Sequence, residues 1–432
     1  MKYYSTNNKN YKVSFKEAIL KGLADDKGLF MPETINPLSK AILSYLQSLS
    51  FQEIAFEISK NFIEDEIPPN DLMTIIESSI SFEAPVVKLS DQLNILELFH
   101  GPTLAFKDFG ARFMARTMEY FLKDSNHELT ILVATSGDTG SAVANGFLNV
   151  KGINVIVLYP GGKISKIQEK QITTLGNNIT AVEVEGTFDD CQRIVKTAFV
   201  DEELKSKINL SSANSINIGR LIPQSFYYFE SFKQIENKNK KIVYSVPSGN
   251  LGNLTAGLFA KKMGLPIHKF IAATNANDIF TKYINLGEYK PRLSEITLSN
   301  AMDVGDPSNL ARIRDLFADD HSQITDVIFS KSYSDQETLN MISELYDNYN
   351  YIIDPHGAIG CLALNDYQNK VENDSVGVVL ETAHPAKFLD VFEKHLTIKP
   401  EIPERLASCL DKKGITIKVS NNYNDFKEIL QK

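Results

Sequence analysis

The arrangement of apolar and polar positions changes character near residue 85. Before this point, apolar residues recur at helical spacing through residues 15–23 and 43–58, which predicts amphipathic helices. After it, short β-rich runs alternate with longer amphipathic stretches. The runs cover residues 93–98, 130–134, 154–158, 179–184, 242–246, 270–273 and 376–380. The pattern predicts a mainly helical N-terminal part followed by alternating strands and helices.

Three successive runs, which begin at residues 130, 154 and 179, are about 25 residues apart, enough for one strand, one turn and one helix. This spacing predicts parallel strands, and the continuous apolar runs are typical of strands buried on both faces. A second series lies between residues 242 and 380. We therefore expect an α/β fold with two open, mostly parallel sheets and flanking helices that face a cleft, plus a mainly helical N-terminal domain. In such sheets, ligands bind beyond the carboxyl ends of the strands.

The length of 432 residues exceeds the roughly 250–300 residues at which a single hydrophobic core stops growing. We expect a helical domain at residues 1–88, a first α/β domain at 89–236 and a second at 237–432. The polar stretch at residues 236–241 is typical of a solvated turn between the last two. These boundaries are approximate, and the domains can interleave.

Composition narrows the classes of function. A net charge of -9 without a dense Lys/Arg stripe argues against a nucleic-acid partner, and no apolar run is long enough to span a bilayer. Residues 1–9 lack the apolar core of a signal peptide, and the three cysteines are far apart, so a cytoplasmic location is expected. The histidines show no tight ligand spacing, so we expect no metal site.

Lys107 lies in the segment His-Gly-Pro-Thr-Leu-Ala-Phe-Lys-Asp-Phe-Gly, residues 100–110, between a predicted strand and a helix that begins near Asp108. Its neighbours are Leu104, Ala105, Phe106 and Phe109. Loss of water around an ammonium group lowers its affinity for a proton and frees the amine as a nucleophile. Alternatively, the stem lies on an apolar surface and the ammonium group reaches water. The local sequence alone favours this second interpretation.

Two Gly-containing turns follow predicted strands and precede helices. The first, residues 134–142, is rich in hydroxyl groups and suits a carboxylate or phosphate, although an ordinary helix cap by Ser136 or Asp138 explains it equally well. The second, residues 246–257, contains Gly249 and Gly252, which allow close approach of a phosphate to the backbone. The alternative is a tight turn that needs glycine only for its angles. The second turn is neither a dinucleotide fingerprint nor a P-loop.

Thr382 stands at the end of the last predicted buried strand, in the segment Leu-Glu-Thr-Ala-His-Pro-Ala-Lys-Phe, residues 380–388. A hydroxyl group at this end of a parallel strand faces the cleft and can hydrogen-bond a ring nitrogen. Taken alone, the residue is more simply explained as a helix cap.

A reactive lysine, a phosphate cradle and a hydroxyl group at a strand end are the three parts that a pyridoxal-phosphate site needs. With them, the chain resembles the threonine synthase family of pyridoxal-phosphate enzymes over nearly its whole length. The likeness rests on residues 4–6, 22–24, 101–113, 135–140, 214–217, 245–257, 271–275, 299–303 and 382–388 together with Phe15. The motifs around Lys107 and in the second turn are specific.

The resemblance implies a site and a reaction. Lys107 would bind pyridoxal 5'-phosphate as a Schiff base and act as the catalytic residue. The cofactor would be held by Lys107, Gly249, Asn250, Leu251, Gly252, Asn253 and Thr382, with Thr382 on the pyridine nitrogen. The substrate side would comprise Thr135, Ser136, Asp138, Thr139, Asn214, Ser215, Asn217 and Arg220. The implied reaction converts O-phospho-L-homoserine and water to L-threonine and phosphate, in a monomer or homodimer.

The chain departs from the family pattern at four positions. Asn7 stands where arginine is usual, Lys27 where glycine is usual, Leu251 where phenylalanine is common and Gly357 where threonine often occurs. None of these changes removes a catalytic group. The rival interpretations are a serine or threonine dehydratase or a cysteine synthase, which share the lysine and the cradle, and a relative that binds without turnover. A nicotinamide oxidoreductase lacks its motif here.

Overall fold

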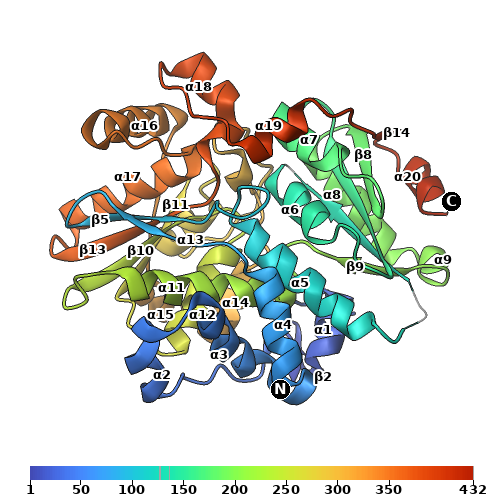
Figure 1. The fold of residues 1–432 in the computed structure, drawn as a ribbon, viewed down its shortest axis with the longest axis horizontal. Helices are drawn as coiled ribbons and strands as arrows, with labels where there is room; N and C mark the ends of the chain where they lie inside the picture. The colour runs from blue at the N-terminus through green and yellow to red at the C-terminus, as the bar shows by residue number, and fades with distance from the viewer. Residues whose placement is uncertain (126–127, 136, 432) are drawn as a thin grey trace.

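The computed structural model describes residues 1–432 except 126, 127, 136 and 432. Two α/β units lie side by side, with α5 (Lys107–Leu122) between them and the N-terminal helices below, as Figure 1 shows. The predicted fold class is confirmed. Within the described part of the chain, no helix is both long and apolar enough to cross a membrane.

The N-terminal region combines helices with a small sheet. Its strands β1 (Tyr3–Ser5), β2 (Asn8–Val13) and β3 (Phe30–Pro32) are antiparallel in the order β2-β1-β3. The helices are α1 (Phe15–Lys21), α2 (Lys40–Tyr45), α3 (Phe51–Ile63) and α4 (Pro69–Ser79). Capping boxes begin α1 at Ser14 and α3 at Ser50. The periodicity predicted the helices but not the sheet, because two of its strands are three residues long and β2 is mostly exposed.

The smaller of the two large sheets has five parallel strands in the order β14-β8-β7-β6-β9. Their bounds are β6 (Leu129–Ala134), β7 (Ile153–Pro160), β8 (Ile179–Glu185), β9 (Asn209–Ser212) and β14 (Ile417–Ser420). The flanking helices are α6 (Asp138–Gly146), α7 (Lys166–Thr173), α8 (Phe188–Val200), α9 (Glu202–Lys205), α19 (Glu404–Leu410) and α20 (Tyr423–Leu430).

The larger sheet has six strands in the order β12-β11-β10-β13-β5-β4, of which β4 alone is antiparallel. Their bounds are β4 (Val86–Lys88), β5 (Leu93–Glu97), β10 (Lys241–Pro247), β11 (Lys269–Thr274), β12 (Ile328–Ser332) and β13 (Ser375–Glu381). Its helices are α10 (Ile218–Leu221), α11 (Phe226–Gln234), α12 (Gly252–Lys262), α13 (Ile279–Leu286), α14 (Leu310–Leu316), α15 (His321–Val327), α16 (Asp335–Tyr349), α17 (Pro355–Lys370) and α18 (Leu389–His395).

All seven predicted apolar runs are strands, but the two sheets exchange strands along the chain. β5 precedes the first series yet joins the larger sheet, and β14 follows the second series yet pairs with β8. The ranges expected for the three domains therefore remain a prediction. The strands of the two large sheets that the pattern missed, β4, β9, β12 and β14, have only three to five residues each.

Candidate active site

Lys107 is the first residue of α5, and the turn before it is hydrogen-bonded to the end of β13. Phe106 donates its N–H to the carbonyl oxygen of Thr382 at 2.9 Å, and His384 donates its N–H to that of Leu104 at 3.0 Å. Leu104 adopts a positive φ of 59°, which bends the chain into the helix. The fold thus brings together the predicted Schiff-base lysine and the predicted ring-nitrogen partner, which are far apart in the sequence.

The surroundings of Lys107 favour a neutral amine. Burial lowers the pKa of Lys107 to about 8, Asp138 opposes this shift, and the positive charges of Arg220 and Lys387 add to it. The face of the Phe106 ring, whose centroid lies 5.5 Å from the nitrogen, attracts a positive charge and so, like Asp138, opposes this shift. A larger fraction of neutral amine near physiological pH is what a nucleophilic lysine needs.

Lys387 and Asp138 form a buried ion pair close to Lys107. Lys387, in the short 3-10 helix η5 (Pro385–Phe388), is fully buried, and its Nζ lies 2.7 Å from Asp138 Oδ1 and 2.9 Å from the carbonyl oxygen of Thr103. Gln168 donates to the same carboxylate oxygen at 3.0 Å. Although burial acts to raise it, the pKa of Asp138 lies below its usual value, mainly because of Lys387 and Lys107. Sequence reasoning gave Lys387 no role; the signal was a charge within the apolar segment Pro-Ala-Lys-Phe.

The second Gly-containing turn leads from β10 into α12 and leaves its backbone donors unused. No acceptor among the described residues receives the N–H groups from Gly249 to Asn253. Leu251 has a φ of 61°, an uncommon conformation for a non-glycine residue. Unpaired N–H groups at a helix N-terminus form an anion site.

The two glycines of this turn have different reasons to be glycine. A Cβ atom on Gly249 would lie 2.9 Å from the carbonyl oxygen of Ala301, so protein backbone excludes it. A Cβ atom on Gly252 would approach nothing closer than 3.6 Å, the distance to Ser215 Cβ. The packing of the protein therefore explains Gly249, whereas a Cβ atom on Gly252 would sit at ordinary van der Waals distance from its neighbours, so protein packing alone does not require glycine there.

The side chains of the two asparagines in the turn are hydrogen-bonded to other parts of the protein. Asn250 donates to Ser215 Oγ at 2.6 Å and accepts from the Ser308 N–H at 2.6 Å. Asn253 donates to the carbonyl oxygen of Pro247 at 2.8 Å. If the turn binds a phosphate, backbone N–H groups are its available donors.

The first Gly-containing turn is partly closed by its own side chains. Thr135 Oγ1 accepts from the N–H groups of Gly137 at 3.0 Å and Gly140 at 2.8 Å, as a helix cap does. The predicted capping alternative therefore has structural support, with Thr135 in place of Ser136 or Asp138. Ser136 lies outside the described residues, and Thr139 is partly exposed.

The predicted substrate residues after β9 differ in how far their side chains are engaged. Asn217 is fully buried and caps α10: it donates to the carbonyl oxygens of Ile19 and Ser212 and accepts from the Gly219 N–H. Asn214 donates to the carbonyl oxygen of Ala134 at 3.2 Å. Both side chains thus have structural partners.

Arg220 is nearly fully buried and incompletely paired. Its Nη1 donates to the carbonyl oxygen of Ala213 at 2.5 Å, while Nε has no partner among the described residues. Burial lowers the pKa of Arg220 to about 10, which leaves it charged at neutral pH. An unsatisfied buried guanidinium close to Lys107 suits an anionic group.

A buried acidic network supports the strand end that carries Thr382. Tyr351 contacts the carboxyl groups of both Glu97 and Glu381, which are paired neighbours in β5 and β13. Burial and the charge of Asp354 raise the pKa of Glu381 well above its usual value. One hydroxyl proton cannot serve two carboxylates, so the raised pKa fits a protonated Glu381. Thr382 itself is 5% exposed, and its hydroxyl group bonds to none of the described residues.

His356, in the first turn of α17, belongs to the same end of the larger sheet. Its Nδ1 lies 2.5 Å from Asp354 Oδ1, and its Nε2 accepts from the Ala301 N–H at 3.2 Å. The histidine thus fixes the segment that packs on Gly249.

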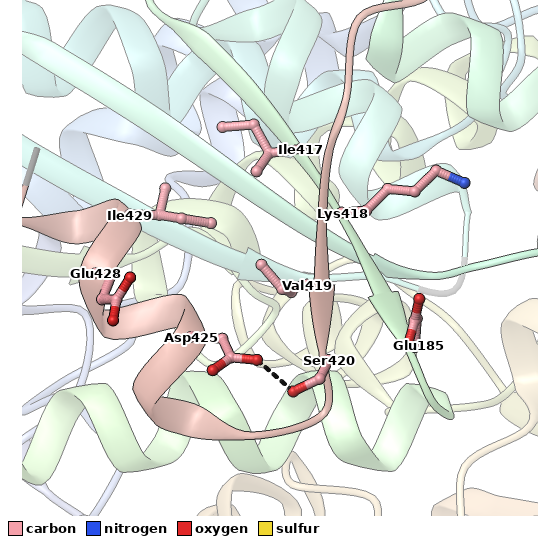
Figure 2. Close-up of a pocket in the computed structure, with 8 residues that line it drawn as sticks. All are labelled: Glu185, Ile417, Lys418, Val419, Ser420, Asp425, Glu428 and Ile429. Atoms are coloured by element: carbon pink, nitrogen blue, oxygen red, sulfur yellow. Dashed lines mark hydrogen bonds between the residues drawn. The ribbon is translucent and has the colours of Figure 1, made fainter.

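A separate surface hollow, shown in Figure 2, is lined by β14 and α20, and none of the predicted site residues lines it.

Three family models match the chain. They are described as "Threonine synthase N terminus" at residues 2–80, "Pyridoxal-phosphate dependent enzyme" at residues 85–382 and "Threonine synthase, C-terminal" at residues 357–430. The chain belongs to the threonine synthase family. It is 44% identical over 432 residues to the threonine synthase of Buchnera aphidicola subsp. Acyrthosiphon pisum, covering 100% of this chain and 99% of the relative.

Solved structures agree with this membership of the threonine synthase family. The crystal structure of threonine synthase from Escherichia coli matches with a TM-score of 0.93 and 41% identity over 100% of this chain and 99% of that one. The pyridoxal-phosphate-bound threonine synthase from Brucella melitensis matches with a TM-score of 0.92 and 32% identity over 100% and 99%. The expected family, enzyme class and cofactor are confirmed.

The local structure fits pyridoxal phosphate. Among the described residues, a lysine of lowered pKa, a row of N–H groups without an acceptor and an unbonded hydroxyl group at Thr382 follow, in this order, the parallel strands β5, β10 and β13 of the larger sheet. These match the aldehyde, the phosphate and the ring nitrogen in chemical character.

The departure at Lys27 falls at a φ of 67°, where the glycine usual in the family would be less strained.

Proposed function

We propose that this member of the threonine synthase family forms L-threonine and phosphate from O-phospho-L-homoserine and water. The observation that carries the proposal is the hydrogen-bonded junction of the Lys107 turn with Thr382. It joins the candidate nucleophile to the candidate ring-nitrogen partner in a chain whose N- and C-terminal parts both match threonine synthase models.

In this proposal, Lys107 holds the cofactor covalently, the N–H groups from Gly249 to Asn253 hold its phosphate and Thr382 holds its ring nitrogen. The bound cofactor supplies an electron-withdrawing ring that stabilises negative charge at the substrate Cα. Once the substrate amino group has displaced it from the cofactor, Lys107 Nζ would take and return the protons at substrate Cα and Cβ, a role that its lowered pKa supports. Water adds at Cβ after phosphate has left Cγ, and Cγ gains a proton.

Arg220 and the first turn would form the substrate side. Arg220 Nε has no partner among the described residues and could donate to the phosphate on Cγ. Ser215, whose Oγ accepts from Asn250 of the second turn, and Thr139 of the first turn would add hydroxyl groups. Asp138, held by Lys387 and Gln168, fixes a negative charge near Lys107. Asn214 and Asn217 would shape this side through the backbone that they hold.

The decisive experiment incubates the purified holoenzyme with O-phospho-L-homoserine and measures both inorganic phosphate and threonine. Equal amounts of both products are expected. Phosphate accompanied by a 2-oxo acid would instead indicate elimination and deamination, the reaction type of the dehydratase rival. Lys107→Ala serves as the control for uncatalysed release.

We further propose that the enzyme works in the cytoplasm, as a monomer or homodimer. The support is the absence of a disulfide among its three cysteines, all of which are free. Cell fractionation tests the location of the enzyme. Light scattering on the protein as it elutes from a size-exclusion column gives its mass and so distinguishes a monomer from a homodimer.

A further inference from the structure

Residues 248–253 form the phosphate cradle of the proposed function. Arg312, on α14, is a fully buried cation beside this cradle. Burial alone accounts for the lowering of its pKa, and within the described residues no carboxylate forms an ion pair with it. A buried charge without a counter-ion is costly unless another group balances it. Neither the predicted cofactor residues nor the predicted substrate residues include Arg312.

The guanidinium joins three segments that are distant in the chain. Nε and Nη2 donate to the carbonyl oxygen of Phe30 in β3 at 3.2 and 3.0 Å. Nη2 also donates to the carbonyl oxygen of Ile216 at 2.6 Å, and Nη1 donates to Asn309 Oδ1 at 2.7 Å. Arg312 therefore connects the N-terminal region to the loop after β9 and to the start of α14.

Asn309 carries this connection to the cradle itself. It is fully buried, and its Nδ2 donates to the carbonyl oxygen of Asn250 at 2.9 Å. The same nitrogen lies 3.7 Å from the position that a Cβ atom on Gly252 would take. One side chain thus separates the buried cation from the unpaired N–H groups.

We propose that Arg312 is a positioning residue for the cofactor phosphate: it holds Asn309 against the cradle, its charge is balanced by the phosphate, and through Phe30 it couples the N-terminal region to cofactor binding. This inference rests on the proposed function, because it takes residues 248–253 as the phosphate site. Buried charges are screened little by salt, so the cation acts on the phosphate across Asn309.

The test compares pyridoxal phosphate with pyridoxal, which lacks the phosphate. Dissociation constants of both for the apoenzyme are measured by equilibrium dialysis in the wild type, Arg312→Met and Arg312→Lys. The preference for pyridoxal phosphate is expected to fall at least tenfold in Arg312→Met and less in Arg312→Lys, which keeps the charge but not the planar fork. A merely structural role would weaken both ligands equally, and that result would overturn the inference.

Arg112→Met is the matched control. Arg112 also holds the N-terminal region, by the carbonyl oxygens of Ser78 and Ser79, but no hydrogen bond or ion pair of the described residues joins it to the cradle. Its loss should leave the preference for pyridoxal phosphate unchanged. An equal fall in Arg112→Met would show that any loosening of the N-terminal region acts on the cofactor, and the specific role of Arg312 would be rejected.

Asn309→Asp covers the case in which Arg312→Met does not fold. The new carboxylate would neutralise Arg312 and repel the phosphate, so the preference for pyridoxal phosphate should fall at least tenfold while pyridoxal binding is kept. An unchanged preference would overturn the inference. Gly252→Val distinguishes failure of the proposed phosphate site from failure of the Arg312 inference. If Gly252→Val leaves pyridoxal phosphate binding intact, the assignment of residues 248–253 as the phosphate site is wrong. If only Gly252→Val, and no variant of Arg312 or Asn309, loses affinity for pyridoxal phosphate, the role of Arg312 alone is rejected.

Discussion

The two Gly-containing turns have the same plan, a strand followed by small residues and a helix, yet they use their groups in opposite ways. In the turn before α6, Thr135 takes up the N–H groups of Gly137 and Gly140, and Asp138 presents a charged side chain to Lys387. In the turn before α12, Asn250 bonds to Ser215 and Asn253 to the carbonyl oxygen of Pro247, and the N–H groups from Gly249 to Asn253 have no acceptor among the described residues.

This difference shows that a Gly-rich turn at a helix N-terminus binds an anion only if its own side chains leave the donors free. The first turn acts through a side chain, Asp138, which influences the charge of Lys107. In the proposed function, the second turn acts through its main-chain N–H groups. The sequence alone gives both turns the same appearance, and the hydrogen-bond partners separate them.

The largest expected effect comes from Lys107→Ala, which removes the proposed catalytic residue itself. Turnover of O-phospho-L-homoserine should fall by at least about 10³-fold, the scale of lost general acid–base catalysis. The fold should persist, since no ion pair of the described residues includes Lys107. Initial rates and the melting temperature check the two parts, and turnover near the wild-type level would reject the proton-transfer role.

The charge on the first turn can be tested through the pH dependence of Lys107. Because its pKa is lowered to about 8, the amine loses its proton at a lower pH than an ordinary lysine, and labelling of the apoenzyme by an amine reagent should reach half its maximal rate near pH 8. The charge of Asp138 raises this pKa, so Asp138→Asn should move the midpoint to lower pH. Mass spectrometry of the peptide that carries Lys107 gives the rates at each pH. A midpoint that stays in place, or moves upward, would remove Asp138 from this role.

Gly252→Val tests the main-chain role of the second turn. A Cβ atom fits there without a clash, so folding should change little, while the side chain occupies the space over the N–H groups. The dissociation constant for pyridoxal phosphate should rise roughly 10- to 100-fold, as expected for losing one or two hydrogen bonds to a charged group. Equilibrium dialysis measures this constant. An unchanged affinity for pyridoxal phosphate would show that the second turn does not bind the phosphate through its main chain, and the proposed difference between the two turns would be wrong.

Gly140→Ala is the counterpart in the first turn and should show the opposite balance. A Cβ atom there would lie 2.5 Å from Thr135 Cγ2 and 2.9 Å from Val157 Cγ1. Overpacking of this kind lowers the free energy of unfolding by about 1–3 kcal/mol. Chemical denaturation of the apoenzyme measures the loss, and the affinity for pyridoxal phosphate should remain close to that of the wild type. A loss of affinity without a loss of stability would contradict the contrast.

Periodicity and motif spacing predicted the α/β class, the seven apolar strands and the positions of Lys107 and the two turns. They could not predict that β5 and β14 cross between sheets, because strand order depends on packing between distant segments. They also missed Lys387 and Arg312, because the roles of these two residues depend on the complete burial of their side chains. A single charged residue in an apolar segment signals such a site weakly, since most lysines and arginines remain at the surface.

Thr382→Val is expected to have the smallest effect and tests whether a hydroxyl group is free for a ligand or used by the protein. The Thr382 hydroxyl bonds to none of the described residues, so its replacement by a methyl group should leave the free energy of unfolding within about 0.5 kcal/mol. If the hydroxyl group donates to the ring nitrogen, the affinity for pyridoxal phosphate should fall about 2- to 10-fold, the equivalent of one neutral hydrogen bond. Thr135→Val is the control, because that hydroxyl caps α6: it should cost about 1 kcal/mol of stability and leave the affinity alone. A cofactor analogue with carbon in place of the ring nitrogen decides the partner, since it should bind wild type and Thr382→Val equally well. If the analogue still distinguishes the two proteins, Thr382 acts on another part of the cofactor, and the proposed contact at the end of β13 is wrong.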